Sequence, residues 1–325
     1  MSRFIVARVA RLYPLYMLCF LVTILATNEV RNWSNFTQMF PFIVTMTHSW
    51  AFIRIDGHPL AQYYPSFSLA WSISTEMGMY LLYPVLLLAL RADRMALPAS
   101  ITAAAVMALL CSAALGFAWS NLPVLDALVR PIISADDSLV VASEKSFVIW
   151  FLFISPYGRF PQFVIGALAA HVYLRLLDRE PGKRESTIWS EVSVVCCLIV
   201  AMMLLPTWLR PGIADKIFEV VRFAPFIALI IFCAARYHRT LVTRVLSLQP
   251  FVSLGLWSYG IYLLQFILDD LFPGMNSNQI PLFEVGVFWA ALVYTSRLAY
   301  TYVEMPARKW IKARAAVQGR YSTRK

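Results

Sequence analysis

An acidic residue, Glu76, lies inside a long apolar segment, and the residues around it could do chemistry. On a helix, Ser72, Glu76 and Tyr80 follow at i, i+4 and i+8 and form one polar stripe, with Tyr83 close behind. A charged side chain at bilayer depth costs roughly 2.5–3.5 kcal/mol, so the stripe should face protein or a water-filled cavity. Two interpretations follow. Glu76 takes part in a reaction, or it is a buried carboxylate that ties two helices together.

Two other apolar segments carry polar stripes of the same kind. Their residues share a helical face at i, i+4 and i+7, and they are Ser258, Tyr262 and Gln265 in one segment and Arg297, Thr301 and Glu304 in the other. Three stripes on three helices predict a shared polar interior, although a structural hydrogen-bond network would also account for them. All other Lys and Arg are counted with the loops or the span ends, and Arg297 alone is placed inside a span, so it is the predicted partner of Glu76.

Basic residues stand at the start of two apolar segments. Arg8 and Arg11 are three positions apart, and their guanidinium groups would suit a phosphate clamp at a membrane surface. Ordinary anchoring of a basic end at the cytoplasmic face also explains this pair. Arg159, Gln162 and Gly166 share a face at i, i+3 and i+7, where we expect Arg159 to reach the membrane interface and Gly166 to allow close helix packing.

The histidines and cysteines give weaker signals. His48 and His58 lie in a long connection, where either could face an acceptor as a base, whereas His171 lies in an apolar segment and should bond a neighbouring helix. The 5 cysteines all lie in apolar runs, and no pair has metal-ligand spacing with histidine. We therefore predict small core residues and no metal site.

Composition sets the class of protein. Of the 325 residues, 60% are hydrophobic and 14% charged, and the mean hydropathy is +0.65. Apolar runs of about 20 residues recur along the whole chain, which is the length that crosses a hydrocarbon core. The net charge of +10 belongs to no soluble module, so it predicts anchoring of loops at the membrane and not nucleic-acid binding.

The expected fold is an all-α, polytopic helical membrane protein that forms a single domain over residues 1–325. About eight transmembrane helices are predicted, at residues 12–27, 70–90, 97–119, 159–176, 188–206, 217–236, 252–271 and 282–304. The termini and the loops on their side hold 19 of the 28 Lys and Arg. By the positive-inside rule both termini should be cytoplasmic. The long connections 28–69 and 120–158 are then outside, and their apolar stretches predict packing against the membrane or the helices.

The motifs, taken in order, resemble the acyltransferase 3 family of bacterial integral-membrane O-acyltransferases. The matching pieces are Arg8-x-x-Arg11-x-x-Pro14, Trp71-Ser-x-x-x-Glu76-x-x-x-Tyr80, Arg159-Phe-x-x-Phe-x-x-Gly166, Ser258-Tyr-x-x-Tyr262 and Glu304-x-Pro306. Each piece is weak alone, but the five occur in family order across nearly the whole chain.

The resemblance implies a function and a set of site residues. It implies transfer of an acyl group, in the first place acetyl, from acyl-CoA to a hydroxyl of a cell-envelope glycan or a lipid-linked acceptor, at the bacterial inner membrane and without a permanently bound cofactor. The implied catalytic residues are Glu76, Ser72, Tyr80 and Arg297. The implied substrate-binding residues are Arg8, Arg11, Trp71, Arg159, Ser258, Tyr259, Tyr262, Gln265 and Glu304.

The chain departs from the family pattern at several points. The family usually has about two further spans upstream, which carry an arginine and the histidine thought to act as base, and this sequence contains no counterpart of them. Gln265 stands where a histidine is common, and Met305 replaces a common arginine. Two alternatives to an active enzyme therefore stay open, namely a catalytically inactive fragment and a permease or carrier of small polar molecules.

Overall fold

The structure is a computed structural model that describes residues 2–27, 33–90, 94–121, 124, 127, 147–209, 223–238, 240–270, 272 and 281–322. The chain forms two compact units, each treated separately below. The first consists of Met1–Pro84 and Gln249–Lys325, and the second of Val85–Leu248. The single domain over residues 1–325 stays a prediction.

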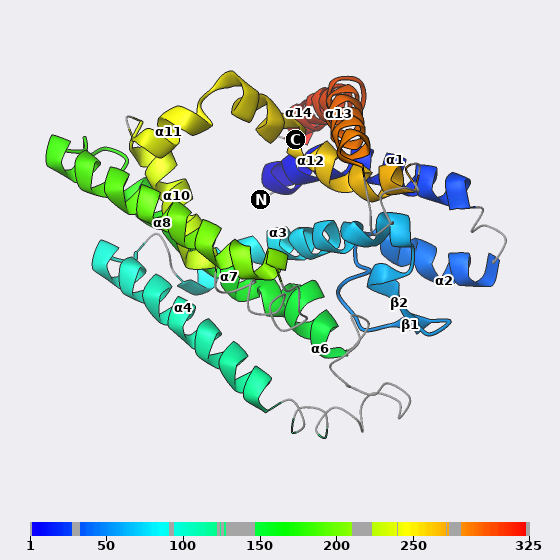
Figure 1. Ribbon diagram of the computed structural model, residues 1–325, viewed down its shortest axis with the longest axis horizontal. Coiled ribbons are helices and arrows are strands. Elements are labelled where there is room, and N and C mark those ends of the chain that lie inside the picture. The colour runs from blue at the N-terminus through cyan, green and yellow to red at the C-terminus, as the bar shows by residue number, and fades with distance from the viewer. Residues whose placement is uncertain are drawn as a thin grey trace. The chain divides into compact units, whose positions relative to one another are not determined.

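The first unit is built around the long helix α1. Its elements are α1 (Ser2–Thr27), α2 (Trp33–Val44), β1 (Arg54–Ile55), β2 (His58–Pro59), 3-10 turns at Leu60–Gln62 and Pro65–Ala70, the first part of α3 (Trp71–Leu90), α12 (Gln249–Asp269), α13 (Leu282–Ala299), a π turn at Tyr300–Glu304 and α14 (Met305–Ser322). Helix α1 packs against α12 and α14, and α12 packs along α13 (Figure 1). The amino- and carboxy-terminal parts of the chain thus form one body.

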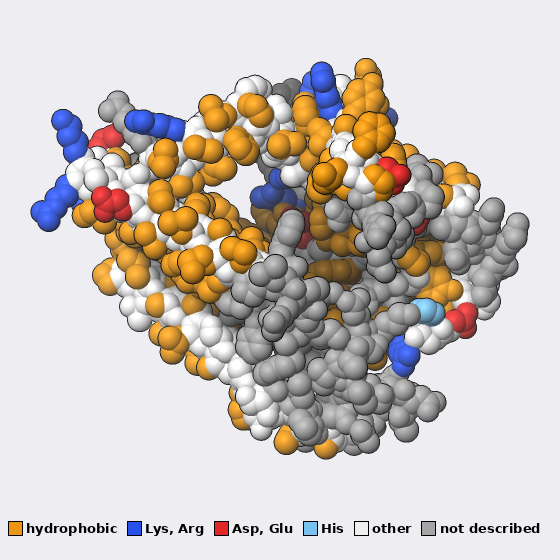
Figure 2. Space-filling model, in the orientation of Figure 1, with side chains coloured by type: hydrophobic (Ala, Val, Ile, Leu, Met, Phe, Trp, Pro, Cys, Tyr) orange, Lys and Arg blue, Asp and Glu red, His pale blue; other side chains and the backbone are white. Residues whose placement is uncertain are grey.

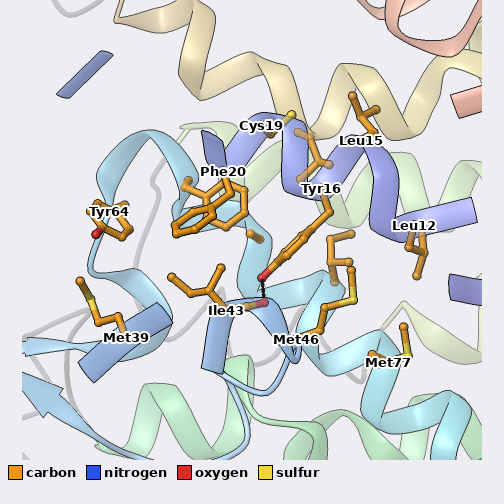
Figure 3. Packing of buried hydrophobic residues seen from close by; sticks show 14 of the residues in the cluster. Leu12, Leu15, Tyr16, Cys19, Phe20, Met39, Ile43, Met46, Tyr64 and Met77 are labelled. Carbon is orange, nitrogen blue, oxygen red and sulfur yellow. Dashed lines mark hydrogen bonds between the residues drawn. The ribbon is translucent and has the colours of Figure 1, made fainter. Parts of the chain in front are cut away.

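An aromatic core joins α1 to the connection that follows it. Tyr16 is fully buried, and its hydroxyl donates a 2.9 Å hydrogen bond to the carbonyl of Ile43 in α2 (Figure 3). Phe20 packs against the rings of Tyr64 and Phe67 in the same cluster. The described residues of the connection, 33–69, therefore pack on the helices, as their apolar stretches predict.

The second unit consists of helices only, among the residues that the structure describes. Its elements are α4 (Leu97–Ser120), α6 (Phe147–Ile149), a π turn at Trp150–Ile154, α7 (Pro156–Arg175), α8 (Lys183–Leu209), α10 (Ala224–Arg236) and α11 (Leu241–Leu246). Helix α7 is central, because it packs against α4 and α10, and α10 in turn packs against α8 (Figure 1). Leu86, Val164 and Leu168 form one of its small apolar clusters.

The prediction of a helical, apolar fold is confirmed, and the number of spans is confirmed only in part. Over the described residues, five helices are long and apolar enough to cross a membrane: Phe4–Ala26, Leu97–Ala114, Lys183–Leu205, Gln249–Asp269 and Leu282–Ala315. The expected spans 70–90, 159–176 and 217–236 are not among them. In the third, the described helix Ala224–Arg236 is apolar but shorter, and residues 217–222 lie outside the described part. Eight spans therefore remain a prediction.

The start of α7 depends on a glycine. Ser155 caps the helix by accepting a hydrogen bond from the Gly158 amide, and a Cβ atom at Gly158 would overlap the carbonyl oxygens of Phe151 and Leu152. We expect Gly158→Ala to destabilise the protein by about 1–3 kcal/mol, because backbone atoms would have to move.

The matched control lies two turns further along the same helix. A Cβ atom at Gly166 would meet no atom of the described residues within 4 Å, so the close packing predicted at Gly166 is not seen among them. Gly166→Ala should therefore be neutral or slightly stabilising, since alanine favours helix. Thermal unfolding in detergent compares the two variants, and equal melting temperatures would contradict the prediction for Gly158.

Candidate functional site

Glu76, Tyr80 and Arg8 meet in the first unit. Helix α3 places Glu76 and Tyr80 one turn apart, and the Tyr80 hydroxyl donates a hydrogen bond to Glu76 Oε1. The Arg8 guanidinium carbon of α1 lies 4.8 Å from the centre of the Tyr80 ring and 5.1 Å from that of Phe4. Two rings therefore hold the arginine by cation–π contacts. One of these rings belongs to Tyr80, the tyrosine that binds the carboxylate. The predicted stripe is confirmed for Glu76 and Tyr80.

A second carboxylate and two more arginines adjoin this group. Glu304 is 3% exposed, and it interacts electrostatically with Arg11 of α1 and Arg308 of α14. Tyr259 of α12 interacts with both Glu76 and Glu304. Three arginines thus stand with two carboxylates, so positive charges outnumber negative ones in the cluster. We call this set, Arg8, Arg11, Glu76, Tyr80, Tyr259, Glu304 and Arg308, the arginine–carboxylate cluster.

Several predicted site residues bind backbone groups instead of one another. The hydroxyls of Ser72 and Tyr262 both donate to the carbonyl of Leu69, at 3.0 and 3.1 Å. Tyr259 donates to the carbonyl of Leu12 at 2.6 Å, which joins α12 to α1. Ser72 therefore does not contact Glu76 through its hydroxyl. The two bonds to Leu69 hold the 3-10 turn that leads into α3, and the bond to Leu12 holds α12 on α1, so the residues position the cluster.

The remaining positions of the α12 stripe differ in exposure. Ser258 is exposed, and its hydroxyl donates to the carbonyl of Gly255 at 2.9 Å. Gln265 is half-buried, as is Trp71 at the first residue of α3. Ser258 thus lies on the outer face of α12, where the prediction of a single inward stripe is wrong. The sequence could not identify that face, because α12 is apolar on nearly every side.

The predicted pairing of Arg297 with Glu76 is wrong. Arg297 is exposed, and its guanidinium lies 5.7 Å from the centre of the Trp257 ring. The predicted common face of Arg297, Thr301 and Glu304 requires a regular α-helix, but Tyr300–Glu304 forms a π turn. The extra residue of a π turn shifts the helical register. Arg297 and Thr301 therefore lie on the exposed side, whereas Glu304 turns inward.

Arg159 belongs to the second unit. Its Nε donates a 2.6 Å hydrogen bond to the carbonyl of Phe153, and its guanidinium lies 4.3 Å from the centre of the Phe153 ring. Arg159, Gln162 and Gly166 line one cavity of about 500 Å³. The predicted common face of these three residues is confirmed, while a substrate-binding role for Arg159 stays a prediction.

The comparisons with known proteins bear on this arrangement. A family model described as an acyltransferase domain matches residues 1–296. The chain belongs to the acyltransferase 3 family. No curated protein and no solved structure matches it. The match covers most of both units of this acyltransferase-family protein. It includes every residue of the arginine–carboxylate cluster that precedes α13.

The site residues that sequence reasoning missed are Phe4 and Arg308. Phe4 packs edge-on to Tyr80, with ring centres 5.9 Å apart, and so helps to hold Arg8. Its spacing gives the signal, because Phe4 and Arg8 are one helical turn apart. Arg308 likewise follows Glu304 by four residues. In the sequence it stands among the basic residues of the C-terminal segment, which indicate only a membrane anchor.

The two loop histidines of this family member differ sharply in their exposure. His58 is exposed on β2, with its ring 6.1 Å from that of Tyr63. His48 is 3% exposed and stacks on Tyr16. The segment of His48 is fixed to α3, because Ser49 and Trp50 bond Ser74 through hydrogen bonds of 2.8 and 2.9 Å. Of the two, His58 has the exposure that an acceptor would need.

Burial lowers the pKa of His48 to about 4, although backbone groups of Ala70 and Phe42 act in the opposite direction. In the unfolded chain the pKa is about 6.5, so the folded protein favours the neutral ring. This contribution to stability is present above pH 6.5 and is lost as the pH falls toward 4.

We therefore expect the melting temperature to fall between pH 6.5 and pH 4.5, and His48→Gln to weaken that dependence. His58→Gln, at an exposed position, should leave the pH profile unchanged. Thermal unfolding across this pH range checks both. Identical profiles for the protein and the His48 variant would show that His48 is not enclosed as described.

Proposed function

We propose that the protein is a membrane O-acyltransferase. It moves an acyl group, acetyl in the simplest case, from acyl-CoA to a hydroxyl of a cell-envelope glycan or related lipid-linked acceptor at the bacterial inner membrane. The observation that carries the proposal is the arginine–carboxylate cluster in a chain of the acyltransferase 3 family. Cations and a carboxylate lie side by side there, and acyl transfer from a phosphate-bearing donor needs both.

The reaction defines what the cluster has to do. The acceptor hydroxyl oxygen attacks the thioester carbonyl carbon and forms an ester bond, while the carbon–sulfur bond breaks and coenzyme A leaves as a thiolate. A base takes the hydroxyl proton, which passes to the thiolate, and hydrogen-bond donors stabilise the oxyanion that develops. The net products are an acyl ester and the free thiol.

We assign roles within the cluster on this basis. Arg8, Arg11 and Arg308 bind the phosphates of the donor, because guanidinium groups pair well with phosphate oxygens. Glu76 orients or polarises the reacting hydroxyl, and Tyr80 fixes the carboxylate by its hydrogen bond. Tyr259 and Tyr262 hold the surrounding helices by their bonds to Leu12 and Leu69.

The proposal is tested with membrane vesicles of both orientations. Radiolabelled acetyl-CoA is supplied with a lipid-linked oligosaccharide fraction from the same cells, and the base-labile label in the acceptor is measured together with the released thiol. We expect ester formation when the donor reaches the cytoplasmic face, where the basic loops predict both termini to lie. Uptake of acetyl-CoA without ester formation would favour the permease, and neither process would favour an inactive member.

A further inference from the structure

A long apolar groove lies in the second unit and shares no residue with the arginine–carboxylate cluster. It has a volume of about 740 Å³ and is lined by residues of α4, α7, α8 and α10. Small side chains make it concave, and these are Ala104, Ala105 and Ala108 of α4, Ala169 of α7 and Ala228 of α10. Helices α4 and α8 are both long and apolar enough to cross a membrane. The groove therefore lies at the depth of lipid chains.

The length of the groove matches one leaflet of a bilayer. Its lining on α4 runs from Leu97, at the start of the helix, to Ala108. Eleven residues of α-helix rise about 16 Å, which is roughly half of a hydrocarbon core about 30 Å thick. An acyl chain that enters at the Leu97 end would reach the middle of the membrane where the groove ends.

One end of the groove is basic. Arg179 and Arg184 line it together with the Leu97 end of α4, and both are exposed. The carboxylate beside them, Glu185, already faces Arg179 and Arg236, each at 3.6 Å, and accepts a 2.9 Å hydrogen bond from Tyr237. Its charge is thus engaged by two cations, and positive charge remains for another anion. Figure 2 shows basic and acidic side chains together at this end of the unit, beside apolar ones.

A second cavity extends this basic end. It measures about 750 Å³ and shares Arg179 and Tyr237 with the groove. Lys183, Arg236 and the hydroxyl-bearing residues Ser186 and Thr187 line it as well, with one carboxylate, Glu180, so the cations outnumber the carboxylate. These groups offer donors for a polar, negatively charged headgroup. The apolar lining of the groove would therefore suit the chains of a phospholipid, and the basic lining that follows it would suit the phosphate.

We propose that this groove binds an anionic phospholipid. One acyl chain lies along the alanine face of α4, and the phosphate binds Arg179 and Arg184. In the orientation predicted from the loop charges, the lipid comes from the cytoplasmic leaflet, which is the anionic one that basic residues recognise. The site lies wholly within the second unit and uses no residue of the arginine–carboxylate cluster. It does not depend on the proposed acyl transfer.

The test uses the purified full chain and native mass spectrometry with two lipids, phosphatidylglycerol and phosphatidylcholine. We expect the protein to retain phosphatidylglycerol in preference. Arg179→Ala with Arg184→Ala should weaken its retention by about tenfold, since two charge-assisted hydrogen bonds are lost. Ala104→Phe should reduce retention of both lipids, because the ring fills the groove.

Two controls distinguish loss of the lipid site from loss of fold and from a general loss of positive charge. Lys309→Ala with Lys312→Ala removes two exposed basic residues of α14 in the first unit, and this variant should retain the lipid like the parent. Each variant is compared by thermal unfolding, so that a loss of fold is recognised. Equal retention of the two lipids, or retention unaffected by the arginine and alanine variants, would overturn the proposal. Displacement by glycerol phosphate alone would assign a phosphate site without a lipid chain and would overturn it as well.

Discussion

Glu76→Gln will reduce acyl transfer by at least about 100-fold while the protein still folds and inserts. The change keeps the size of the side chain and a hydrogen-bond acceptor for Tyr80, but it removes the charge that orients or polarises the reacting hydroxyl. Positioned acid–base groups typically contribute about 10²- to 10⁴-fold, which sets the expected size. The measurement is transfer of radiolabelled acetyl to the acceptor at matched protein levels.

Two variants show whether the effect belongs to the reaction. Glu284→Gln removes a half-buried carboxylate in the first turn of α13, away from the proposed reaction, and should leave transfer unchanged. Tyr80→Phe keeps the carboxylate charge and loses only its hydrogen-bond donor, so it should cost less than Glu76→Gln. If Glu76→Gln lowers the melting temperature but leaves transfer intact, the carboxylate only ties helices together.

Arg8→Ala combined with Arg11→Ala will weaken binding of acyl-CoA by about 10- to 100-fold. Hydrogen bonds to charged groups contribute about 1.5–3 kcal/mol, and each 1.4 kcal/mol changes affinity tenfold. Arg8→Lys should lose part of this affinity although it keeps the charge, because a lysine does not reproduce the planar fork held between Phe4 and Tyr80. Binding of a labelled acyl-CoA to the purified protein measures the effect of both changes.

The matched control for this pair is Arg314→Ala. Arg314 is also an arginine over an aromatic ring, 4.1 Å from the centre of Trp310, but it is exposed near the end of the described part of α14. Its removal should leave the affinity for acyl-CoA unchanged. Undiminished binding by the Arg8 and Arg11 variant would leave those residues as membrane anchors only.

Much of the fold could be predicted from the sequence, because its dominant signals are local. Apolar runs of membrane length predict helices, and a regular helix places Glu76 and Tyr80 on one face, where the structure has them in contact. The same reasoning failed for the stripe of Arg297, Thr301 and Glu304, since nothing in the spacing reveals the π turn at Tyr300–Glu304. Local periodicity thus predicts a site only where the helix stays regular.

The long-range contacts of the site could not be predicted in this way. Arg8 is recognisable as a candidate cation, but its place over the Tyr80 ring depends on how α1 packs beside α3. His48 has the sequence context of a loop residue, yet it is enclosed, because the connection folds back on Tyr16. Pairings of this kind depend on tertiary packing, which no single segment encodes.

The π turn between α13 and α14 has a consequence for insertions and deletions. Helix α13 is fixed against α12, where Gly260 lies so close that a Cβ atom there would be 3.1 Å from Cβ of Ser296. Deleting one residue, such as Thr301, would restore a continuous α-helix and rotate α14 by about 100° relative to α13. Glu304 and Arg308, which both follow the deletion, would rotate together away from Arg11 of α1. The length of this helix, counted in single residues, therefore decides whether the C-terminal arginine can serve the cluster.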